Sequence, residues 1–152
     1  MNLSLNFKLE LQAYCVSIVK KKCDLLKKQI LARKQDLETA SKSSAGDKHE
    51  TARAMIHLEQ EKLGFQYQQV FKQLKMLSQC DVYKHATIQS GSLILTDKAL
   101  IYISVALGKI QFKNKLVYVI SPVSPLAQVF LNANATHTLS FQGTPYVVLE
   151  II

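Results

Sequence analysis

The chain has 152 residues, of which 48% are hydrophobic and 20% are charged. This composition excludes an intrinsically disordered protein and suits one globular domain or two small ones. The formal net charge of +8 at pH 7 fits a nucleic-acid or acidic-protein partner, and it fits a solvated helix face equally well. Residues 1–78 carry most of the excess, with 14 Lys and Arg against 8 Asp and Glu.

The sequence lacks the patterns of a membrane or secreted protein. It has no run of about 18 apolar residues, and its first twelve residues have no basic region, apolar core or cleavage site of a signal peptide. Cys15, Cys23 and Cys80 show no CxxC spacing, which favours reduced thiols over a metal site or a disulfide framework. We therefore expect a cytoplasmic protein with no membrane partner.

The first half predicts two long helices. Residues 7–40 contain neither Pro nor Gly, and residues beyond a break at 41–47 continue the pattern. Apolar residues recur every seven positions on both sides of the break, which is typical of coiled-coil seams. On the first helix these are Leu11, Ile18, Leu25 and Ala32, with Cys15 between the first two; on the second they are Ile56, Leu63, Val70 and Leu77, with Gln60, Tyr67 and Leu74 between them.

The polar and small residues of the break force the chain to turn back. We expect an antiparallel coiled-coil hairpin over residues 1–79, with its tip near residues 41–50. Its simplest role is a structural arm or a dimerisation hairpin.

After Cys80 the pattern changes to short segments rich in β-branched and aromatic residues, which predict strands. Gly91, Gly108, Lys113-Asn114 and Gly143-Thr144 separate them as turns. The predicted strands are residues 92–97, 99–107, 109–112, 115–121, 137–142 and 145–152.

Ser124-Pro125 predicts the start of one short helix, with Ser124 as its N-cap and Pro125 at its first position. Leu126, Val129 and Phe130 would form its apolar face. We expect residues 80–152 to form a small domain, an antiparallel sheet of about four to six strands with this helix packed on it, and the whole chain to be α+β.

The turn 46-GDKHET-51 has two interpretations. Gly46 suits a sharp turn, Asp47 is a good N-cap, and Glu50 three residues later completes a capping-box pattern. Alternatively, two carboxylates at the end of a long hairpin form half of a Mg²⁺ site, because Mg²⁺ is often held by one or two carboxylates while other partners supply the rest.

The order of these features resembles the Gre family of bacterial transcript cleavage factors. That family has an N-terminal coiled coil, a tip with the pattern G-D-x-x-E, and a small C-terminal domain with an S-P-[LI]-[GA] helix start. Here the tip reads Gly46-Asp47-Lys48-His49-Glu50, followed by Ala52, and the helix start reads Ser124-Pro125-Leu126-Ala127. The resemblance in architecture covers nearly the whole chain.

The resemblance implies a C-terminal domain of FKBP-like fold over residues 80–152 that docks on bacterial RNA polymerase. The hairpin would enter the secondary channel of the polymerase, where Asp47 and Glu50 help to hold a weakly bound Mg²⁺ and stimulate cleavage of backtracked RNA. The chain alone would bind no cofactor and would not be an enzyme, because the hydrolytic site belongs to the polymerase. A monomer fits this role.

Basic residues along the first helix acquire a function in this interpretation. Lys27, Lys28, Arg33 and Lys34 would guide the hairpin toward the RNA 3′ end and the acidic mouth of the channel. The alternative is a solvated helix face.

The tip also departs from the family pattern. Lys48, Thr51 and Arg53 replace a hydrophobic residue, an Asn and an acidic residue, so positive charge surrounds the two carboxylates. A channel regulator that does not cleave RNA, or a coiled-coil interaction module, is therefore the alternative function.

Overall fold

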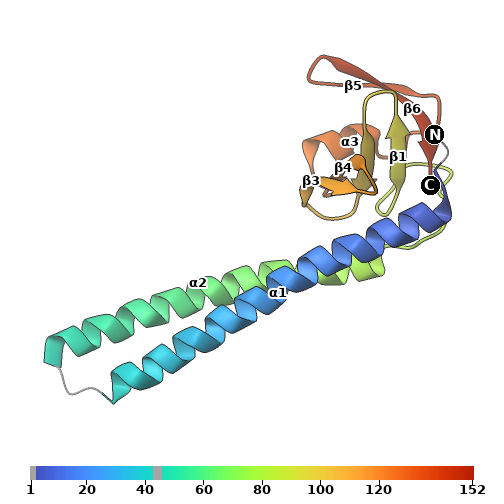
Figure 1. Cartoon of the computed structure of the whole chain (residues 1–152). Helices are drawn as coiled ribbons and strands as arrows, with labels where there is room; N and C mark the ends of the chain where they lie inside the picture. The colour runs from blue at the N-terminus through green and yellow to red at the C-terminus, as the bar shows by residue number, and fades with distance from the viewer. Residues whose placement is uncertain (1–2, 43–45) are drawn as a thin grey trace. The chain divides into compact units, whose positions relative to one another are not determined.

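A computed structural model of the chain describes residues 3–42 and 46–152, with only the backbone for residues 46–49. The described residues form three α-helices and six β-strands (Figure 1). They fall into two compact units, one made of Met1–Val16 with Lys75–Ile152 and the other of Ser17–Leu74. The α+β class is confirmed, and the expected division at residues 79–80 stays a prediction. No helix in the described residues is long and apolar enough to cross a membrane.

Two long helices form the predicted hairpin, α1 over Leu5–Ser41 and α2 over Gly46–Gln79. Ser4 begins α1 by accepting a hydrogen bond from the backbone N–H of Phe7 at 3.0 Å. The predicted seam of α2 is confirmed, because its members are half-buried or buried while most of their neighbours are exposed. These members are Ile56, Gln60, Leu63, Tyr67, Val70, Leu74 and Leu77.

The seam predicted for α1 is wrong at Leu25, whereas Leu11 is buried and Ile18 and Ala32 are half-buried. Leu25 is 58% exposed, whereas its neighbour Leu26 is half-buried. A straight α-helix turns by 3.6 residues, so a strict seven-residue repeat drifts around it. The less exposed side of α1 instead advances by steps of four and three, which places apolar side chains where the strict repeat would require Lys22 and Gln29. It follows Leu11, Cys15, Val19, Cys23, Leu26, Ile30, Arg33 and Leu37.

The second half of the chain builds one six-stranded sheet in the order β3-β4-β2-β1-β6-β5. Its strands lie close to the predicted segments. They are β1 Leu93–Thr96, β2 Leu100–Ile103, β3 Gly108–Phe112, β4 Lys115–Ile120, β5 Thr138–Phe141 and β6 Thr144–Ile151.

The expectation of an antiparallel sheet is wrong for one pair, since β2 and β4 are parallel, with Leu100 opposite Val117. The two-residue turn Lys113-Asn114 has φ of 49° and 60°, as a tight hairpin requires, and it returns β4 antiparallel to β3. β4 then lies between β3 and β2, where Val117 and Val119 are buried. The strand pattern predicts each strand but not its neighbours, so the mixed sheet is not visible in the sequence.

The predicted short helix is α3, Pro125–Phe130. Ser124 caps it, its hydroxyl accepting a hydrogen bond from the N–H of Ala127 at 3.2 Å, and Pro125 lies in its first turn. Ala127 and Phe130 join a buried cluster with residues of β1, β2 and β6, including Ile94, Ile101 and Val148. This cluster is the core of the sheet unit.

The first turns of α1 pack on the sheet unit that they belong to. The rings of Phe7 and Tyr14 lie 5.3 and 5.2 Å from the ring of Phe112 on β3, and Glu10 forms an ion pair with Lys113. The N–H of Leu3 donates to the carboxylate of Glu150 on β6. These contacts join the start of the chain to β3, at one end of the sheet order, and to β6 on the other side of the sheet centre.

Candidate functional site

The hairpin tip is the first candidate site. α1 ends at Ser41, α2 begins at Gly46, and Glu50 has an exposed side chain in the first turns of α2. The side chain of Asp47 lies outside the described residues, and so does the expected pairing of Asp47 with Glu50, as a helix cap or as two metal ligands. Arg53, one turn after Glu50, is also exposed.

The chemistry of the tip follows from its place at a helix start. Carboxylates near the N-terminus of a helix are stabilised in their charged form by the helix dipole. Within the described residues, no group of three or more His, Cys, Asp and Glu side chains is placed to hold a metal ion. A metal at Glu50 would therefore need ligands from Asp47 and from a partner.

The basic side of the hairpin is the second candidate, and the structure separates its four expected members. Lys27, Lys28 and Lys34 are exposed. Arg33 is half-buried and forms ion pairs with Asp36 at 2.8 Å and with Glu59 on α2 at 3.2 Å. Arg33 thus links α1 to α2 through its ion pair with Glu59. The three lysines are exposed, so a partner can contact them.

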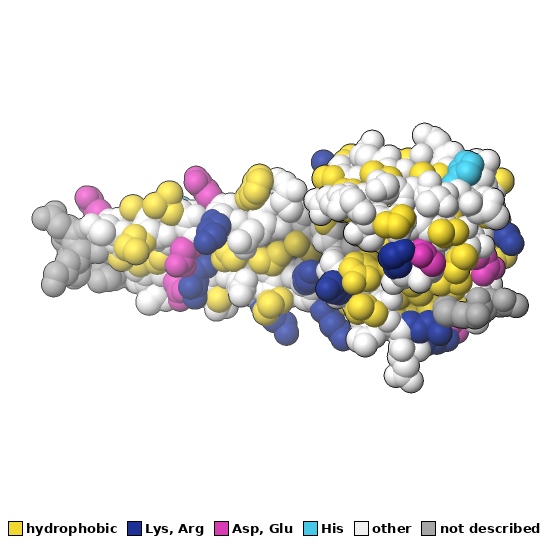
Figure 2. All heavy atoms as spheres, turned by 90° about the horizontal axis from the view of Figure 1, so that it is seen from above, with side chains coloured by type: hydrophobic (Ala, Val, Ile, Leu, Met, Phe, Trp, Pro, Cys, Tyr) yellow, Lys and Arg dark blue, Asp and Glu magenta, His cyan; other side chains and the backbone are white. Residues whose placement is uncertain are grey.

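Lys27 belongs to a mixed basic and aromatic surface that the sequence analysis missed. Its ammonium lies 5.8 Å from the ring centroid of Tyr67, and that ring stacks on Phe71 with 5.9 Å between centroids. A groove of about 330 Å³ lies between the two helices here, lined by Lys20, Cys23, Asp24, Lys27, Tyr67, Phe71 and Leu74. Figure 2 shows hydrophobic and basic side chains close together on the hairpin surface. The signal in the sequence was the four-residue spacing of Tyr67 and Phe71.

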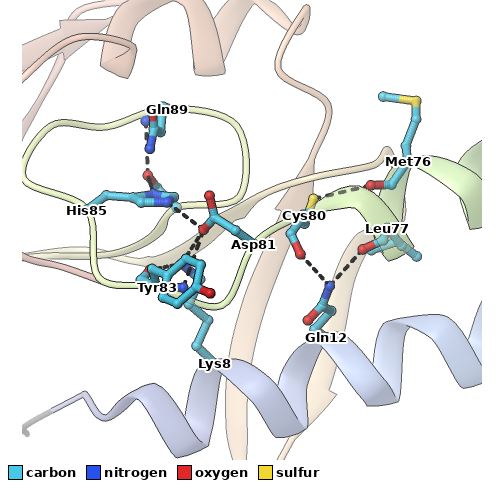
Figure 3. A network of polar contacts seen from close by, with 10 residues as sticks. Lys8, Gln12, Met76, Leu77, Cys80, Asp81, Tyr83, His85 and Gln89 are labelled. Carbon is cyan, nitrogen blue, oxygen red and sulfur yellow. Dashed lines mark hydrogen bonds and ion pairs between the residues drawn. The ribbon is translucent and has the colours of Figure 1, made fainter.

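The third candidate is a polar network in the sheet unit (Figure 3). Asp81 Oδ1 lies 2.7 Å from Nε2 of His85, and Nδ1 of His85 lies 2.7 Å from the hydroxyl of Ser92. Lys8 is fully buried, and its ammonium donates to the carbonyl of Tyr83 at 2.7 Å and lies 3.9 Å from Asp81. The network ties the start of α1 to the segment that follows α2.

Two pKa values in this network are shifted. Burial lowers the pKa of Lys8, and the charge of Asp81 opposes that effect. For Asp81, partial burial raises the pKa, but the hydrogen bond from His85 and the positive charges nearby outweigh it, so its pKa lies below the usual value. Asp81 is therefore ionised at neutral pH.

Ser92, His85 and Asp81 have the residue types of a catalytic triad, but the arrangement does not suit catalysis. Ser92 is fully buried, and its hydroxyl also accepts the N–H of Gln89 at 2.9 Å. A nucleophile must reach a substrate, and this hydroxyl is enclosed and already bonded on two sides. The three residues hold the loop before β1 in place. Their signal in the sequence was the four-residue spacing of Asp81 and His85.

A second set of hydrogen bonds, beside this network, holds the end of α2. The side-chain amide of Gln12 donates to the carbonyls of Leu77 and Cys80, at 2.7 and 2.9 Å (Figure 3). Leu77 lies in the last turn of α2 and Cys80 directly follows the helix, so Gln12 donates to carbonyls that no longer receive the regular helical hydrogen bond. The thiol of Cys80 also lies 3.4 Å from the carbonyl of Met76.

Comparisons of the chain with protein-family models, with curated proteins and with solved structures found no match. The function is therefore argued from the residues and their geometry.

Proposed function

We propose that this protein is a Gre-like regulator of bacterial RNA polymerase. Its helical hairpin enters the secondary channel, and its C-terminal domain, of FKBP-like fold, docks at the rim of that channel. The observation that carries the proposal is the chain order. A long helical hairpin with Asp47 and Glu50 at the start of its second helix precedes a sheet domain whose one helix begins at Ser124-Pro125.

The dimensions of the helices support this role. α1 has 37 residues and α2 has 34. At about 1.5 Å per residue, α2 is roughly 50 Å long, which suits a probe that reaches into a deep channel. α1 ends at Ser41 and α2 begins at Gly46, so Glu50 is near the far end of both arms.

In this proposal, the tip brings two carboxylates to a metal site that groups of the polymerase complete. Asp47 and Glu50 would bind Mg²⁺ together with groups of the polymerase, and the bound ion would supply a water of lowered pKa and stabilise charge on the phosphate. The chain itself contributes position and negative charge, and the protein alone is not a nuclease.

The exposed lysines of α1 support binding to an anionic partner. Lys27, Lys28 and Lys34 present positive charge toward solvent, and such charge speeds the approach to RNA or to acidic protein surfaces. Arg33 contributes less to this surface, because Asp36 and Glu59 neutralise it.

A second candidate is a channel regulator that does not stimulate cleavage. The observation that favours it is the exposed Arg53 one turn from Glu50, with Lys48 also close in sequence. Positive charge there weakens the hold of two carboxylates on a cation. In that case Asp47 and Glu50 act as helix caps, and the hairpin acts by occupying the channel.

Transcript cleavage with backtracked bacterial elongation complexes tests the proposal. Wild type is compared with the Asp47→Asn/Glu50→Gln double variant, after both have been shown to bind polymerase equally. We expect Mg²⁺-dependent release of a short RNA fragment with wild type and its loss, by about 100-fold or more, with the variant.

The control is Asp24→Asn/Glu61→Gln, which changes the charge by the same amount at exposed positions away from the tip. It should cleave as wild type does. Binding without cleavage by wild type would select the second candidate, and no binding to polymerase would refute both.

A further inference from the structure

A small polar pocket lies in the sheet unit, next to the network of Figure 3 and separate from the hairpin tip. Its volume is about 200 Å³. Small-molecule sites usually measure about 300–1,000 Å³, and one water occupies about 30 Å³, so the pocket suits a single side chain. It is lined by Met76, Gln79, Cys80, Asp81, Ser90 and Ser104.

Only one of the two carboxylate oxygens of Asp81 makes polar contacts within the described residues. The contacts with His85, Lys8 and the N–H of Tyr83 all involve Oδ1. Within the described part of the chain, Oδ2 has no hydrogen-bond partner, and Figure 3 shows it pointing away from the network. The side chain is 43% exposed and lines the pocket.

Ser104 supplies a second unused group. It is 1% exposed, it lines the pocket, and its hydroxyl has no hydrogen-bond partner among the described residues. A buried hydroxyl without a partner is destabilising, and such groups in folded proteins are places where an ordered water or a ligand binds.

The charge of the pocket is opposite to that of the chain. The protein has a net charge of +8, yet no Lys or Arg is among the described residues that line this pocket. Lys8 is buried, and its ammonium donates to the carbonyl of Tyr83 and lies 3.9 Å from Oδ1 of Asp81, so it offsets this charge only from the side of Oδ1. An ionised carboxylate beside hydroxyl and amide acceptors therefore attracts a cation that carries several N–H donors.

We propose that this pocket binds the side chain of an arginine that a partner protein presents. A guanidinium has five N–H donors in a plane, so one edge can pair with Oδ2 of Asp81 while another N–H donates to Ser104. A lysine ammonium offers three donors at one point and would satisfy the two groups less well. The contact is independent of the proposed cleavage function.

The test uses the full-length protein alone and N-acetyl-L-arginine amide as the probe. Backbone NMR shifts are followed during titration at constant ionic strength. We expect saturable shifts, with a millimolar Kd, that are largest at Cys80, Asp81, Ser90 and Ser104. The citrulline analogue, which has the same shape without the charge, should bind at least about tenfold more weakly, and the lysine analogue should bind more weakly than the arginine probe.

Asp81→Asn should weaken binding of the arginine probe by about tenfold or more, while its amide oxygen still accepts from His85. Asp97→Asn is the matched control. Asp97 is also in the sheet unit and pairs with Lys98 and the N–H of Val147, but it does not line the pocket. This control should bind the probe as wild type does.

Ser104→Ala separates a ligand site from a pocket that only holds water. We expect it to weaken probe binding several-fold and to leave the melting temperature unchanged or raised, because it removes an unpaired buried hydroxyl. The proposal is overturned if citrulline binds as well as arginine, if Asp81→Asn binds normally, or if no shifts appear at 20 mM probe, about tenfold above the expected Kd. A lower melting temperature of Ser104→Ala with unchanged binding would also overturn it.

Discussion

Lys8 shows how one residue can join two distant parts of the chain at an energetic cost. Its ammonium is fully buried yet, among the described residues, has a single close acceptor, the carbonyl of Tyr83, with Asp81 at 3.9 Å. Burial disfavours the charged form and lowers its pKa. The folded protein therefore binds this proton less tightly than the unfolded chain does.

The sign of the pH effect follows from this shift. Below the folded pKa of Lys8 the cost is fully present, and it disappears as the pH rises toward the usual value of 10.5. We expect the free energy of unfolding of wild type, relative to Lys8→Met, to rise between pH 7 and 10.5. Urea unfolding at several pH values measures this difference, and a flat or falling difference would contradict the assignment.

Lys8→Met and Lys8→Ala form a matched pair. Methionine keeps most of the buried volume, so we expect it to change stability by about 1 kcal/mol or less at pH 7. Alanine leaves a cavity, and we expect a loss of about 2–4 kcal/mol.

At the scale of elements, the side chains that pair α1 with α2 are buried on α1 as far as Cys23 and only half-buried beyond it. Leu26, Ile30 and Leu37 on α1 are only half-buried, and many positions on both helices are exposed. The apolar contact between the arms is therefore thin, and the ion pair of Arg33 with Glu59 adds a polar brace. Small changes in this seam should affect the hairpin measurably.

Leu25 and Leu26 test where the seam lies. Leu26→Ala removes a half-buried side chain, and we expect it to lower stability by about 1–2 kcal/mol. Leu25→Ala removes a side chain that is 58% exposed, and we expect a change within about 0.5 kcal/mol. Thermal unfolding followed by circular dichroism at 222 nm compares them, since that signal reports helix. Equal losses, or a larger loss for Leu25, would restore the strict seven-residue seam.

At the scale of the whole molecule, the net charge of +8 is distributed unevenly along the chain. Between Ser17 and Lys34, α1 carries seven Lys and Arg and a single Asp. Such a dense basic segment strengthens binding to an anionic surface, and the strength falls as salt screens it.

Replacing Lys27, Lys28 and Lys34 with Gln should flatten the salt dependence of binding to polymerase elongation complexes. The control replaces Lys98, Lys109 and Lys115 of the sheet unit, which removes the same charge. Binding measured by fluorescence anisotropy from 50 to 300 mM salt gives the two slopes. If both triple variants flatten the slope equally, net charge alone explains the effect, and an unchanged slope in the first variant would remove the lysines of α1 from the interface.

Much of the fold could be predicted from local patterns. The absence of Pro and Gly over residues 7–40 predicts α1, alternating β-branched segments predict the six strands, and Ser124-Pro125 predicts α3. Each of these signals acts within a few residues through backbone sterics, capping or side-chain periodicity.

The candidate site was predicted less well. The sequence pointed to Asp47, Glu50 and the basic residues, but it did not show that Arg33 is bound to Glu59 or that Tyr67 and Phe71 lie beside Lys27.

The sequence by itself determined which segments form helices and strands, because those preferences depend on neighbouring residues, although the strand predicted over residues 99–107 ends at Ile103. Only the tertiary structure decided the parallel pairing of β2 with β4, the less exposed side of α1, and the meeting of Lys8, Asp81 and His85. These features bring together residues that are far apart in the chain. Their free energies depend on how deeply each group is buried and on which group it contacts. From the sequence alone, a charged side chain such as that of Lys8 is expected to be solvated, but in the folded protein it is buried.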